Sequence, residues 1–277
     1  YSSIGTRTVK LISTSSVGCI DSISKQVVTN ASPISSFTVN DTTQCINNNS
    51  FSFTNASTGA TSYNWNYGDF TFATSINGSR FYSNSGTYLV SLISEISGCK
   101  DTSTAKVYVH ELPLIGFTID NDSQCFSTNV FNMVDTSKIG LGTLSRLWDF
   151  GDMSTSILKS PSHSYSSDDV FTIRLVVTSS NGCIDSLSKQ VLTSPTPDAN
   201  FGVNDSTQCL NDNYFVFSNT SSITNGFMRF EWDFGDDSTS IAANGTHTYL
   251  KPGTYSVQLR VYSLSGGCVD SISRDIR

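Results

Sequence analysis

Charged residues are scarce in this sequence, and their scarcity excludes several functional classes. They make up 14% of the 277 residues, against about 25% in a typical soluble protein. The 16 Lys and Arg residues are outnumbered by 23 Asp and Glu residues, and the formal net charge is −7. No basic stripe is available to neutralise phosphates, so we expect no nucleic-acid partner. No run approaches the roughly 20 apolar residues of a membrane span, so we expect no membrane insertion of these residues.

The side-chain combinations that catalysis requires are also missing. The sequence has three histidines, His110, His163 and His247. The last two occupy equivalent positions of a repeat and so fall in separate domains, where we expect each to bond a loop backbone. There is no Gly-x-Ser-x-Gly elbow, no P-loop and no Gly-x-Gly-x-x-Gly fingerprint. The sequence therefore predicts no enzyme activity and no cofactor.

The seven cysteines include no Cys-x-x-Cys pair. This absence argues against a zinc site and against a thioredoxin-type motif. Single cysteines at regular spacing, in a chain whose polar residues are mainly Ser, Thr and Asn, are typical of an oxidising, extracellular setting. The alternative is that they are buried free thiols.

The chain contains an internal repeat. A Trp recurs about every 83 residues and opens the same motif each time. The three motifs are Trp65-Asn-Tyr-Gly-Asp69, Trp148-Asp-Phe-Gly-Asp152 and Trp232-Asp-Phe-Gly-Asp236. A Gln-Cys site precedes each motif, at Cys45, Cys125 and Cys209. A Gly-Cys turn, with the pattern Gly-Cys-x-Asp, contains the other cysteines, which are Cys19, Cys99, Cys183 and Cys268.

These landmarks divide the chain into four parts. Residues 1–29 have a Gly-Cys turn but no Trp, and we expect them to be the C-terminal strands of a truncated repeat. Three full repeats follow at 30–111, 112–194 and 195–277, called here the first, second and third repeats. Each has a proline shortly before its first-strand Phe, which stiffens the junction. We therefore expect the domains to form an extended rod.

Within a repeat, the pattern of apolar residues has a period of two. Residues 171–177 and 255–261 alternate apolar and polar side chains, as half-buried strands do. Gly and Asn before the last strand supply a tight turn, and no segment shows a helical stripe. Six or seven short strands in about 80 residues predict an all-β, immunoglobulin-like β-sandwich. We expect each Trp to pack between the sheets, and Tyr88, Phe171 and Tyr255 to anchor the sixth strand.

The order of the motifs resembles the PKD domain family. Trp-Asp-Phe-Gly-Asp is followed by His-x-Tyr at His163 and His247, and then by Gly-Thr-Tyr255 in the third repeat. The resemblance covers all three repeats and the strands before them. The first repeat departs from it, because Asn66 and Tyr67 replace Asp-Phe and there is no His-x-Tyr.

The added Gln-Cys and Gly-Cys-x-Asp-Ser elements are similar to those of tandem PKD arrays in the very large cell-surface gliding adhesins of Bacteroidota, of the SprB type. This resemblance implies tandem β-sandwiches, display on the extracellular cell surface, and a binding or spacer role without catalysis. The partners that it implies are neighbouring PKD repeats of the same chain, an extracellular surface or polysaccharide, and a gliding motility machinery that acts elsewhere in the chain.

The aspartates of the motif are candidate ligands for Ca²⁺, because carboxylates are hard oxygen ligands. They are Asp149 and Asp152 in the second repeat, and Asp233, Asp236 and Asp237 in the third. Two or three turn carboxylates do not supply the six or more oxygens that Ca²⁺ usually takes. We therefore favour a structural role, in which the first Asp caps backbone N–H groups and the second shapes the turn.

Several triplets that begin Asp-Ser or Asp-Thr resemble the O-glycosylation signal of secreted Bacteroidota proteins. The alternative is chance in a chain rich in Ser and Thr. The candidate acceptors are Ser22, Thr42, Ser186, Ser206, Ser238 and Ser271.

The topology of an immunoglobulin-like sandwich bears on the cysteine pairing. The Gln-Cys site would follow the first strand and the Gly-Cys turn would precede the last, so the two fall at opposite ends of a domain. A strand of about eight residues spans roughly 26 Å, whereas a disulfide needs Cα atoms within about 7 Å. We therefore predict bonds between successive repeats, Cys45–Cys183 and Cys125–Cys268, with Cys19, Cys99 and Cys209 left over. The rival scheme stays within repeats and pairs Cys45–Cys99, Cys125–Cys183 and Cys209–Cys268.

Taken together, these features predict a structural segment of a long extracellular filament. It would space an adhesive surface from the cell and transmit force in surface gliding. The alternative is a set of polysaccharide-binding accessory PKD modules of a secreted hydrolase. A line of exposed aromatics on one sheet face would favour that alternative, and polar sheet faces with buried aromatics would favour the spacer.

Overall fold

A computed structural model describes residue 1 and residues 3–277 of the chain, and strands account for nearly all of its regular structure. Across these residues there is no α-helix, and the single helical element is the 3-10 turn η1 (Phe126–Thr128). Accordingly, the described residues include no helix long and apolar enough to cross a membrane. The all-β, immunoglobulin-like prediction is confirmed.

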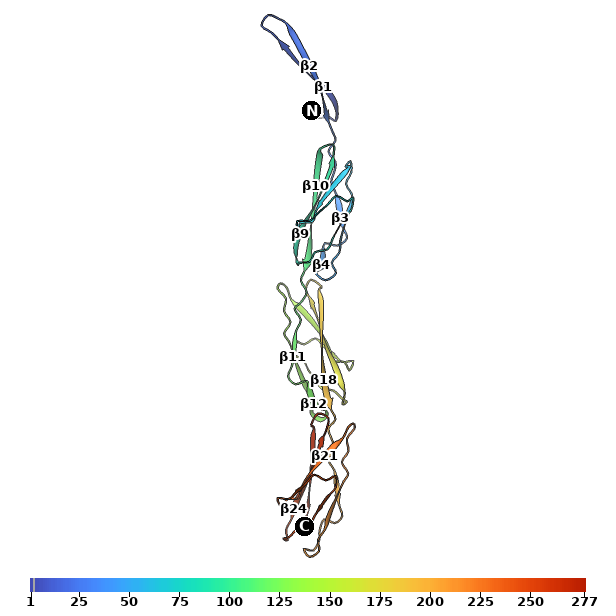
Figure 1. Ribbon diagram of the computed structural model, residues 1–277, viewed down its shortest axis with the longest axis vertical. Helices are drawn as coiled ribbons and strands as arrows, with labels where there is room; N and C mark the ends of the chain where they lie inside the picture. The colour runs from blue at the N-terminus through green and yellow to red at the C-terminus, as the bar shows by residue number, and fades with distance from the viewer. Residues whose placement is uncertain (2) are drawn as a thin grey trace. The chain divides into compact units, whose positions relative to one another are not determined.

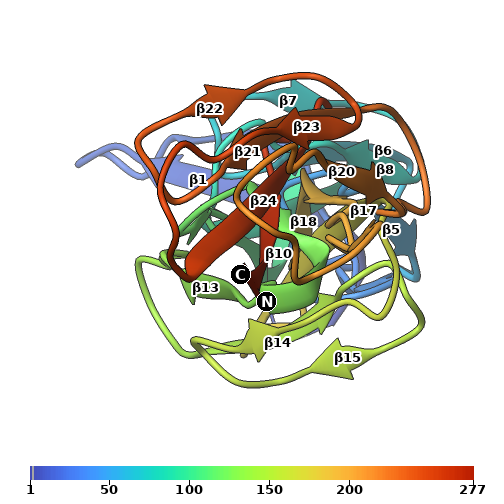
Figure 2. The same ribbon diagram turned by 90° about the horizontal axis from the view of Figure 1, so that it is seen from below.

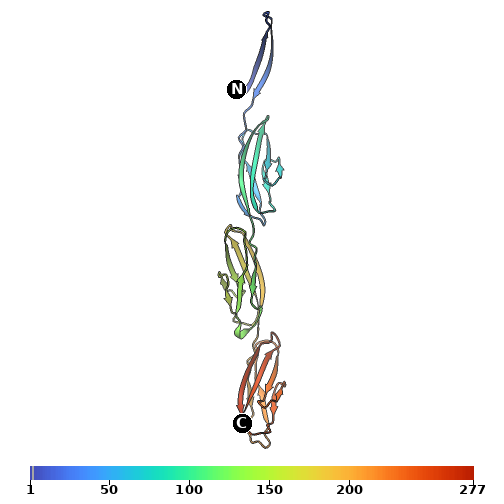
Figure 3. The same cartoon turned by 90° about the vertical axis from the view of Figure 1, so that its left-hand side faces the viewer.

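The first strands form a hairpin without further partners among the described residues. Strand β1 (Gly5–Thr14) pairs with β2 (Ile20–Thr29) in antiparallel register, with Thr14 opposite Ile20 next to the Gly-Cys turn. Figure 3 shows this hairpin in dark blue. Most of its side chains are exposed, because the described part of the chain provides no second sheet to cover it.

In the first repeat, two sheets enclose a core (Figure 1). The larger has the order β4-β10-β9-β6-β7, with bounds β4 (Thr43–Cys45), β10 (Cys99–His110), β9 (Gly86–Ile96), β6 (Ser62–Asn66) and β7 (Phe72–Ala73). The smaller has the order β3-β5-β8, with bounds β3 (Phe37–Val39), β5 (Phe51–Asn55) and β8 (Gly78–Arg80).

The second repeat has the same topology. Its larger sheet has the order β12-β18-β17-β14-β15, with bounds β12 (Ser123–Cys125), β18 (Ile184–Ser194), β17 (Val170–Ser179), β14 (Leu144–Asp149) and β15 (Thr155–Ser156). Its smaller sheet has the order β11-β13-β16, with bounds β11 (Phe117–Ile119), β13 (Phe131–Asp135) and β16 (Ser162–His163).

The third repeat has one strand fewer among the described residues, and Figure 2 draws it in orange to red. Its larger sheet has the order β22-β21-β24-β25, with bounds β22 (Thr239–Ser240), β21 (Met228–Asp233), β24 (Tyr255–Ser263) and β25 (Val269–Ile276). Its smaller sheet has the order β19-β20-β23, with bounds β19 (Phe201–Val203), β20 (Phe215–Asn219) and β23 (Gly245–His247).

The Gln-Cys sites differ from the expected loops. In the first and second repeats they form the short strands β4 and β12, which pair in parallel with the ends of β10 and β18. Their Gln side chains reinforce this arrangement: Gln44 accepts from the backbone N–H of Ser50 at 2.7 Å and donates to the carbonyl oxygen of the same residue at 3.1 Å. In the third repeat, Gln208 and Arg277 share one backbone bond of 2.9 Å, and no strand forms there among the described residues.

Each sandwich is organised around its Trp, as the sequence predicts. Trp65, Trp148 and Trp232 are fully buried. Each indole packs edge-on against the first-strand Phe of its repeat, with ring centroids 5.1 Å apart in all three cases. Each indole N–H donates to the backbone carbonyl ten residues later, at 3.0, 2.9 and 3.0 Å. The sixth-strand residues Tyr88, Phe171 and Tyr255 are half-buried. Each stacks on a buried Tyr of its own repeat, with ring centroids 3.7 to 3.9 Å apart; these partners are Tyr82, Tyr165 and Tyr249.

The Gly of the Trp motif is required for two reasons. Gly151 has a φ of +83°, which L side chains rarely adopt, and a Cβ there would lie 2.8 Å from the carbonyl oxygen of Thr172 on β17. Gly68 and Gly235 have the same conformation and meet the backbone of β9 and β24 in the same way. The motif turn therefore packs directly against the neighbouring strand.

We predict that Gly151→Ala destabilises the second repeat more than Gly182→Ala does. Gly182 has a nearly identical φ of +80°, but a Cβ added there would meet nothing within 4 Å. Its substitution should therefore cost only the conformational penalty of about 1–2 kcal/mol. Gly151→Ala adds the overlap with Thr172, worth about 1–3 kcal/mol more. Hydrogen exchange of β14 and β17 amides measures the free energy of unfolding of this repeat, and equal destabilisation by the two variants would contradict the prediction.

Candidate functional site

The second Asp of the Trp motif binds two neighbouring segments together. In the second repeat, Asp152 accepts hydrogen bonds from the backbone N–H of Ser154 at 3.0 Å and from its hydroxyl. The other carboxylate oxygen lies 2.7 Å from Nε2 of His163 on β16. The first Asp, Asp149, accepts from the backbone N–H of Gly151 at 2.9 Å. We call the cluster of Asp152, Ser154 and His163, with its equivalents in the other repeats, the Asp cluster.

The third repeat repeats this geometry. Asp236 lies 2.8 Å from Nε2 of His247 and accepts from the backbone of Ser238 at 3.2 Å, while Asp233 caps Gly235 at 2.9 Å. The imidazole of each cluster also stacks on the Phe of the motif, with centroids 4.3 Å apart in the second repeat and 4.5 Å apart in the third. The partner of His163 and His247 is thus a carboxylate rather than the loop backbone that the sequence suggested.

The first repeat builds the same cluster from different residues. Arg80 occupies the position of the histidines, and its Nε donates to Asp69 at 2.7 Å. Asn66 replaces the first Asp and accepts from the backbone N–H of Gly68 at 2.9 Å. The absent His-x-Tyr is therefore an Arg-x-Tyr, with Tyr82 in the place of the family tyrosine. His110, the remaining histidine, ends β10, and its carbonyl accepts from Ile46 at 2.8 Å.

This geometry assigns the aspartates to turn structure. Both carboxylate oxygens of Asp152 and of Asp236 bond to protein partners. No group of three or more His, Cys, Asp or Glu side chains in the described part of the chain is placed to hold a metal ion. The Asp cluster instead connects the edge of the larger sheet to the third strand of the smaller one.

Burial and hydrogen bonding act in opposite directions on these carboxylates. Burial raises the pKa of Asp152, but the hydrogen bonds from Ser154 and His163 together outweigh it, so its pKa lies below the ordinary 3.8. The same balance lowers the pKa of Asp236. In the first repeat, bonds from Thr71 and Arg80 lower the pKa of Asp69 against the effect of burial.

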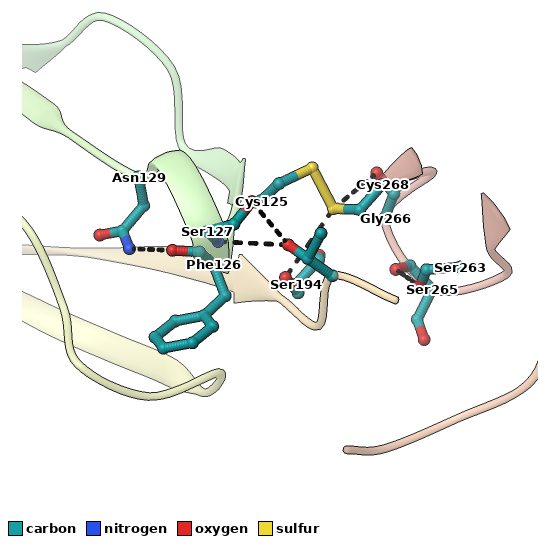
Figure 4. Close-up of a disulfide and its surroundings, with 10 residues drawn as sticks. Cys125, Phe126, Ser127, Asn129, Ser194, Ser263, Ser265, Gly266 and Cys268 are labelled. Carbon is teal, nitrogen blue, oxygen red and sulfur yellow. Dashed lines mark hydrogen bonds between the residues drawn. A yellow bond between two sulfur atoms is a disulfide. The ribbon is translucent and has the colours of Figure 1, made fainter. Parts of the chain in front are cut away.

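The cysteines join residues that are far apart in the sequence. Cys45 bonds to Cys183 with a sulfur–sulfur distance of 2.03 Å, and Cys125 bonds to Cys268 (Figure 4). The Cα atoms are 5.6 Å apart in both bridges. Each bridge therefore connects the Gln-Cys site of one repeat to the Gly-Cys turn of the following repeat, and the intra-repeat scheme does not occur in the structure. Cys99 is half-buried and unpaired, and Cys19 and Cys209 are exposed and unpaired.

Polar contacts surround the Cys125–Cys268 bridge, within one compact unit formed by residues 113–180 and 184–277. The hydroxyl of Thr196 accepts from the backbone N–H of Ser127 at 3.2 Å, and Asp168 accepts from Thr224 and Asn225, both at 3.1 Å. A Cβ at Gly266 would overlap the Ser194 side chain. The Gly-Cys turn of the third repeat is therefore closely packed at this junction (Figure 4).

Five of the six candidate glycosylation sites have exposed side chains that take no part in the Asp cluster. The sixth, Ser238, donates its hydroxyl to Asp236 in the Asp cluster. That hydroxyl has a structural partner, so Ser238 is a poor acceptor. The remaining candidates are Ser22, Thr42, Ser186, Ser206 and Ser271.

We predict that Asp152→Asn lowers the stability of the second repeat at neutral pH and weakens its dependence on acid. Because the folded pKa is depressed, the carboxylate contributes stability that is present above about pH 4 and lost as the pH falls through the folded pKa. The substitution should cost about 1 kcal/mol or slightly more at pH 7, and little of that cost should remain near about pH 2. Urea unfolding followed by hydrogen exchange at several pH values measures the free energy of unfolding of the second repeat and its dependence on pH.

Asp236→Asn is the matched control, because it should produce the same loss in the third repeat and leave the second unchanged. An unaltered pH dependence of the second repeat in Asp152→Asn would contradict this role of the Asp cluster.

Solved structures similar to this chain include single domains and longer arrays. The PKD1 domain of Vibrio anguillarum Epp is 24% identical, covers 31% of this chain and 96% of its own, and has a TM-score of 0.28. The PKD1 domain of the Vibrio cholerae metalloprotease PrtV is 25% identical, covers 30% of this chain and 98% of its own, and has a TM-score of 0.27. The N-terminal eight Ig domains of Down Syndrome Cell Adhesion Molecule are 13% identical, cover 99% of this chain and 40% of their own, and have a TM-score of 0.55, which supports the immunoglobulin-like fold.

The family comparison covers most of the sequence. The PKD domain model matches residues 30–109, 111–193 and 194–276, so that one match corresponds to each repeat within one residue at its start. PKD domains are typical of extracellular proteins and are typically non-catalytic. The chain therefore belongs to the PKD domain family and contains three such domains in tandem.

Proposed function

We propose that this chain is a structural segment of an extracellular, cell-surface filament, which spaces an adhesive surface from the cell and transmits force in surface gliding, as in SprB-type adhesins. The observation that supports it most is the pattern of the two disulfides, which connect successive PKD domains instead of closing single ones. A binding module gains little from such bonds. A segment under tension gains a covalent path that does not depend on the linkers.

The distribution of aromatic residues also favours a spacer. The Trp, and most Phe and Tyr side chains of each sandwich, belong to its core. Phe70, Phe72 and Phe81 are exposed in the first repeat, at 96%, 64% and 54%. The second repeat has Met153, Thr155 and Ser164 at these positions, and the third has Asp237, Thr239 and Thr248. Exposed aromatics therefore do not recur, as a repeated polysaccharide site would require.

The two disulfides define overlapping covalent loops. Cys125 precedes Cys183 in the sequence, so the loop closed by Cys45–Cys183 and the loop closed by Cys125–Cys268 share residues 125–183. Under tension, the shortest covalent path runs from residue 1 to Cys45, across to Cys183, back to Cys125, across to Cys268 and on to residue 277. Breaking one bond barely lengthens that path, whereas breaking both releases the whole chain.

We predict that losing both disulfides lengthens the fully extended chain by much more than the sum of the two single losses. Single molecules held at residues 1 and 277 are stretched until every domain unfolds, with Cys19, Cys99 and Cys209 replaced by Ser. Cys45→Ser or Cys125→Ser alone should lengthen the fully extended chain by only about 70–100 Å, and both together by about 550–600 Å, at roughly 3.3–3.6 Å per residue.

Two results would count against the mechanical role. Under the intra-repeat scheme, Cys125→Ser alone would add about 200 Å, since it would release a single domain. Extension that is the same in oxidised and reduced chains would show that the bonds bear no tension. Retention of the chain on a polysaccharide column, lost on Phe70→Ser with Phe72→Thr, would support the binding alternative instead.

We also predict O-linked glycans on five acceptors, Ser22, Thr42, Ser186, Ser206 and Ser271. Glycans there would shield strand edges that otherwise pair with neighbouring filaments. The intact mass of the chain from its natural source should exceed the polypeptide mass and fall after β-elimination. Equal masses before and after would reject the modification, and sugar on Ser238 would contradict the structural reason for leaving it out.

A further inference from the structure

We propose that Asn181, in the Gly-Cys turn of the second repeat, is a site of spontaneous deamidation that converts it to aspartate and isoaspartate. The proposal concerns a modification site and does not rest on the mechanical function above. It follows from comparing the four Asn-Gly pairs of the chain, which begin at Asn77, Asn181, Asn225 and Asn244.

The reaction needs only water. Glycine has no Cβ to hinder its own backbone nitrogen, and the nitrogen of Gly182 forms a bond to the side-chain carbonyl carbon of Asn181. The bond from that carbon to the amide nitrogen breaks, and the proton of the attacking N–H leaves with that nitrogen as ammonia. Water then opens the succinimide ring at either of its two carbonyls. One water is consumed, one ammonia is released, and no oxidant takes part.

Two of the four pairs are fixed where a strand of the smaller sheet begins. Asn77 accepts a hydrogen bond from the backbone N–H of Asn55 at 3.0 Å, and Asn244 accepts from that of Asn219 at 2.9 Å. The glycines that follow are buried in β8 and β23, which pair with β5 and β20. A Cβ on them would lie 3.2 and 3.1 Å from the buried Trp of the repeat. Attack by these backbone nitrogens therefore requires the strand to open first.

A single hydrogen bond restrains the pair that begins at Asn225. The side-chain nitrogen of Asn225 donates to a carboxylate oxygen of Asp168 at 3.1 Å. Both Asn225 and Gly226 are exposed, and neither belongs to a strand. Rotation of the amide toward the nitrogen of Gly226 breaks the bond to Asp168, so this pair should react more slowly than a free one.

The side chain of Asn181 is not held in this way. It is exposed and makes no hydrogen bond within the described part of the chain. Gly182 is exposed too, and a Cβ there would meet nothing within 4 Å. Both residues lie in the turn between β17 and β18, so their rotation breaks no strand pairing. Asn181 is therefore the Asn of the four that its surroundings leave free to react.

The product alters a turn that carries a disulfide. Cys183, two residues after Asn181, is bonded to Cys45. Aspartate adds a negative charge to this turn, and isoaspartate also inserts a carbon atom into the main chain. The equivalent positions of the other three Gly-Cys turns hold Val17, Ser97 and Gly266. The modification is therefore confined to one of the four turns.

The test incubates the oxidised 277-residue chain in warm, mildly alkaline buffer made with heavy-oxygen water, so that each new event incorporates heavy oxygen. Peptide mapping by mass spectrometry measures the product at each Asn-Gly pair, and an isoaspartate methyltransferase labels the isoaspartate. Asn181 should react about tenfold faster than Asn225, the factor expected for release of one hydrogen bond to a carboxylate. Asn77 and Asn244 should remain unmodified over the same period.

Two controls separate the effect of structure from that of sequence. Asp168→Ala removes the acceptor of Asn225 and should raise the rate at Asn225 to that at Asn181, which should not change. In guanidinium with reductant, all four pairs should react at similar rates, since each is Asn followed by Gly. The proposal is overturned if Asn181 yields no product, if another pair of the folded chain reacts as fast, if Asp168→Ala leaves Asn225 unchanged, or if the unfolded chain keeps the same order of rates.

Discussion

The indole N–H of each buried Trp has to find an acceptor inside its sandwich, and the chain supplies one ten residues later in every repeat. An unpaired donor in that position would cost roughly 1–3 kcal/mol. To deliver the carbonyl, the chain must turn immediately after the Trp strand. That turn requires the positive φ and the missing Cβ of the motif Gly. The turn also places the second Asp of the motif opposite the smaller sheet, where the Asp cluster forms. The turn, the motif Gly and the Asp cluster of each domain therefore depend on the hydrogen bond that its indole N–H donates.

Alternation of apolar residues was sufficient to predict the strands, the Trp core and the fold class, because these depend on local pattern. The sequence did not reveal that Arg80 stands in for His163 and His247. An Arg in place of a His keeps the contact with the carboxylate through a different side chain, and only this shared contact with the second Asp of the motif makes the two positions equivalent. The short strands at Cys45 and Cys125 were also unpredictable from local pattern, since they exist only by parallel pairing with the end of a strand far along the sequence.

Substitutions between the repeats show how the same fold tolerates different electrostatics. The guanidinium of Arg80 is always charged, whereas His163 and His247 are charged only when protonated. The second repeat also has an ion pair between the buried Asp135 and the half-buried Arg146, at 2.7 Å. The first and third repeats have Asn at the Asp135 position and Tyr or Phe at the Arg146 position. Since a buried pair is often no more stabilising than apolar packing, the repeats can diverge here without losing the sandwich.

The long sequence separation of the bridges has a consequence for the order of folding. During synthesis Cys45 emerges well before Cys183, and the cysteines nearest to it in sequence are Cys19 and Cys99. Loop-closure entropy favours those nearer partners in an unfolded chain. The bridges Cys45–Cys183 and Cys125–Cys268, separated by 138 and 143 residues, therefore require that the sandwiches fold first and bring the thiols together. Oxidation then follows the folding of the two domains that each bond connects. Each disulfide can therefore form only between two neighbouring domains that have both folded, so the presence of the bond indicates that both are folded.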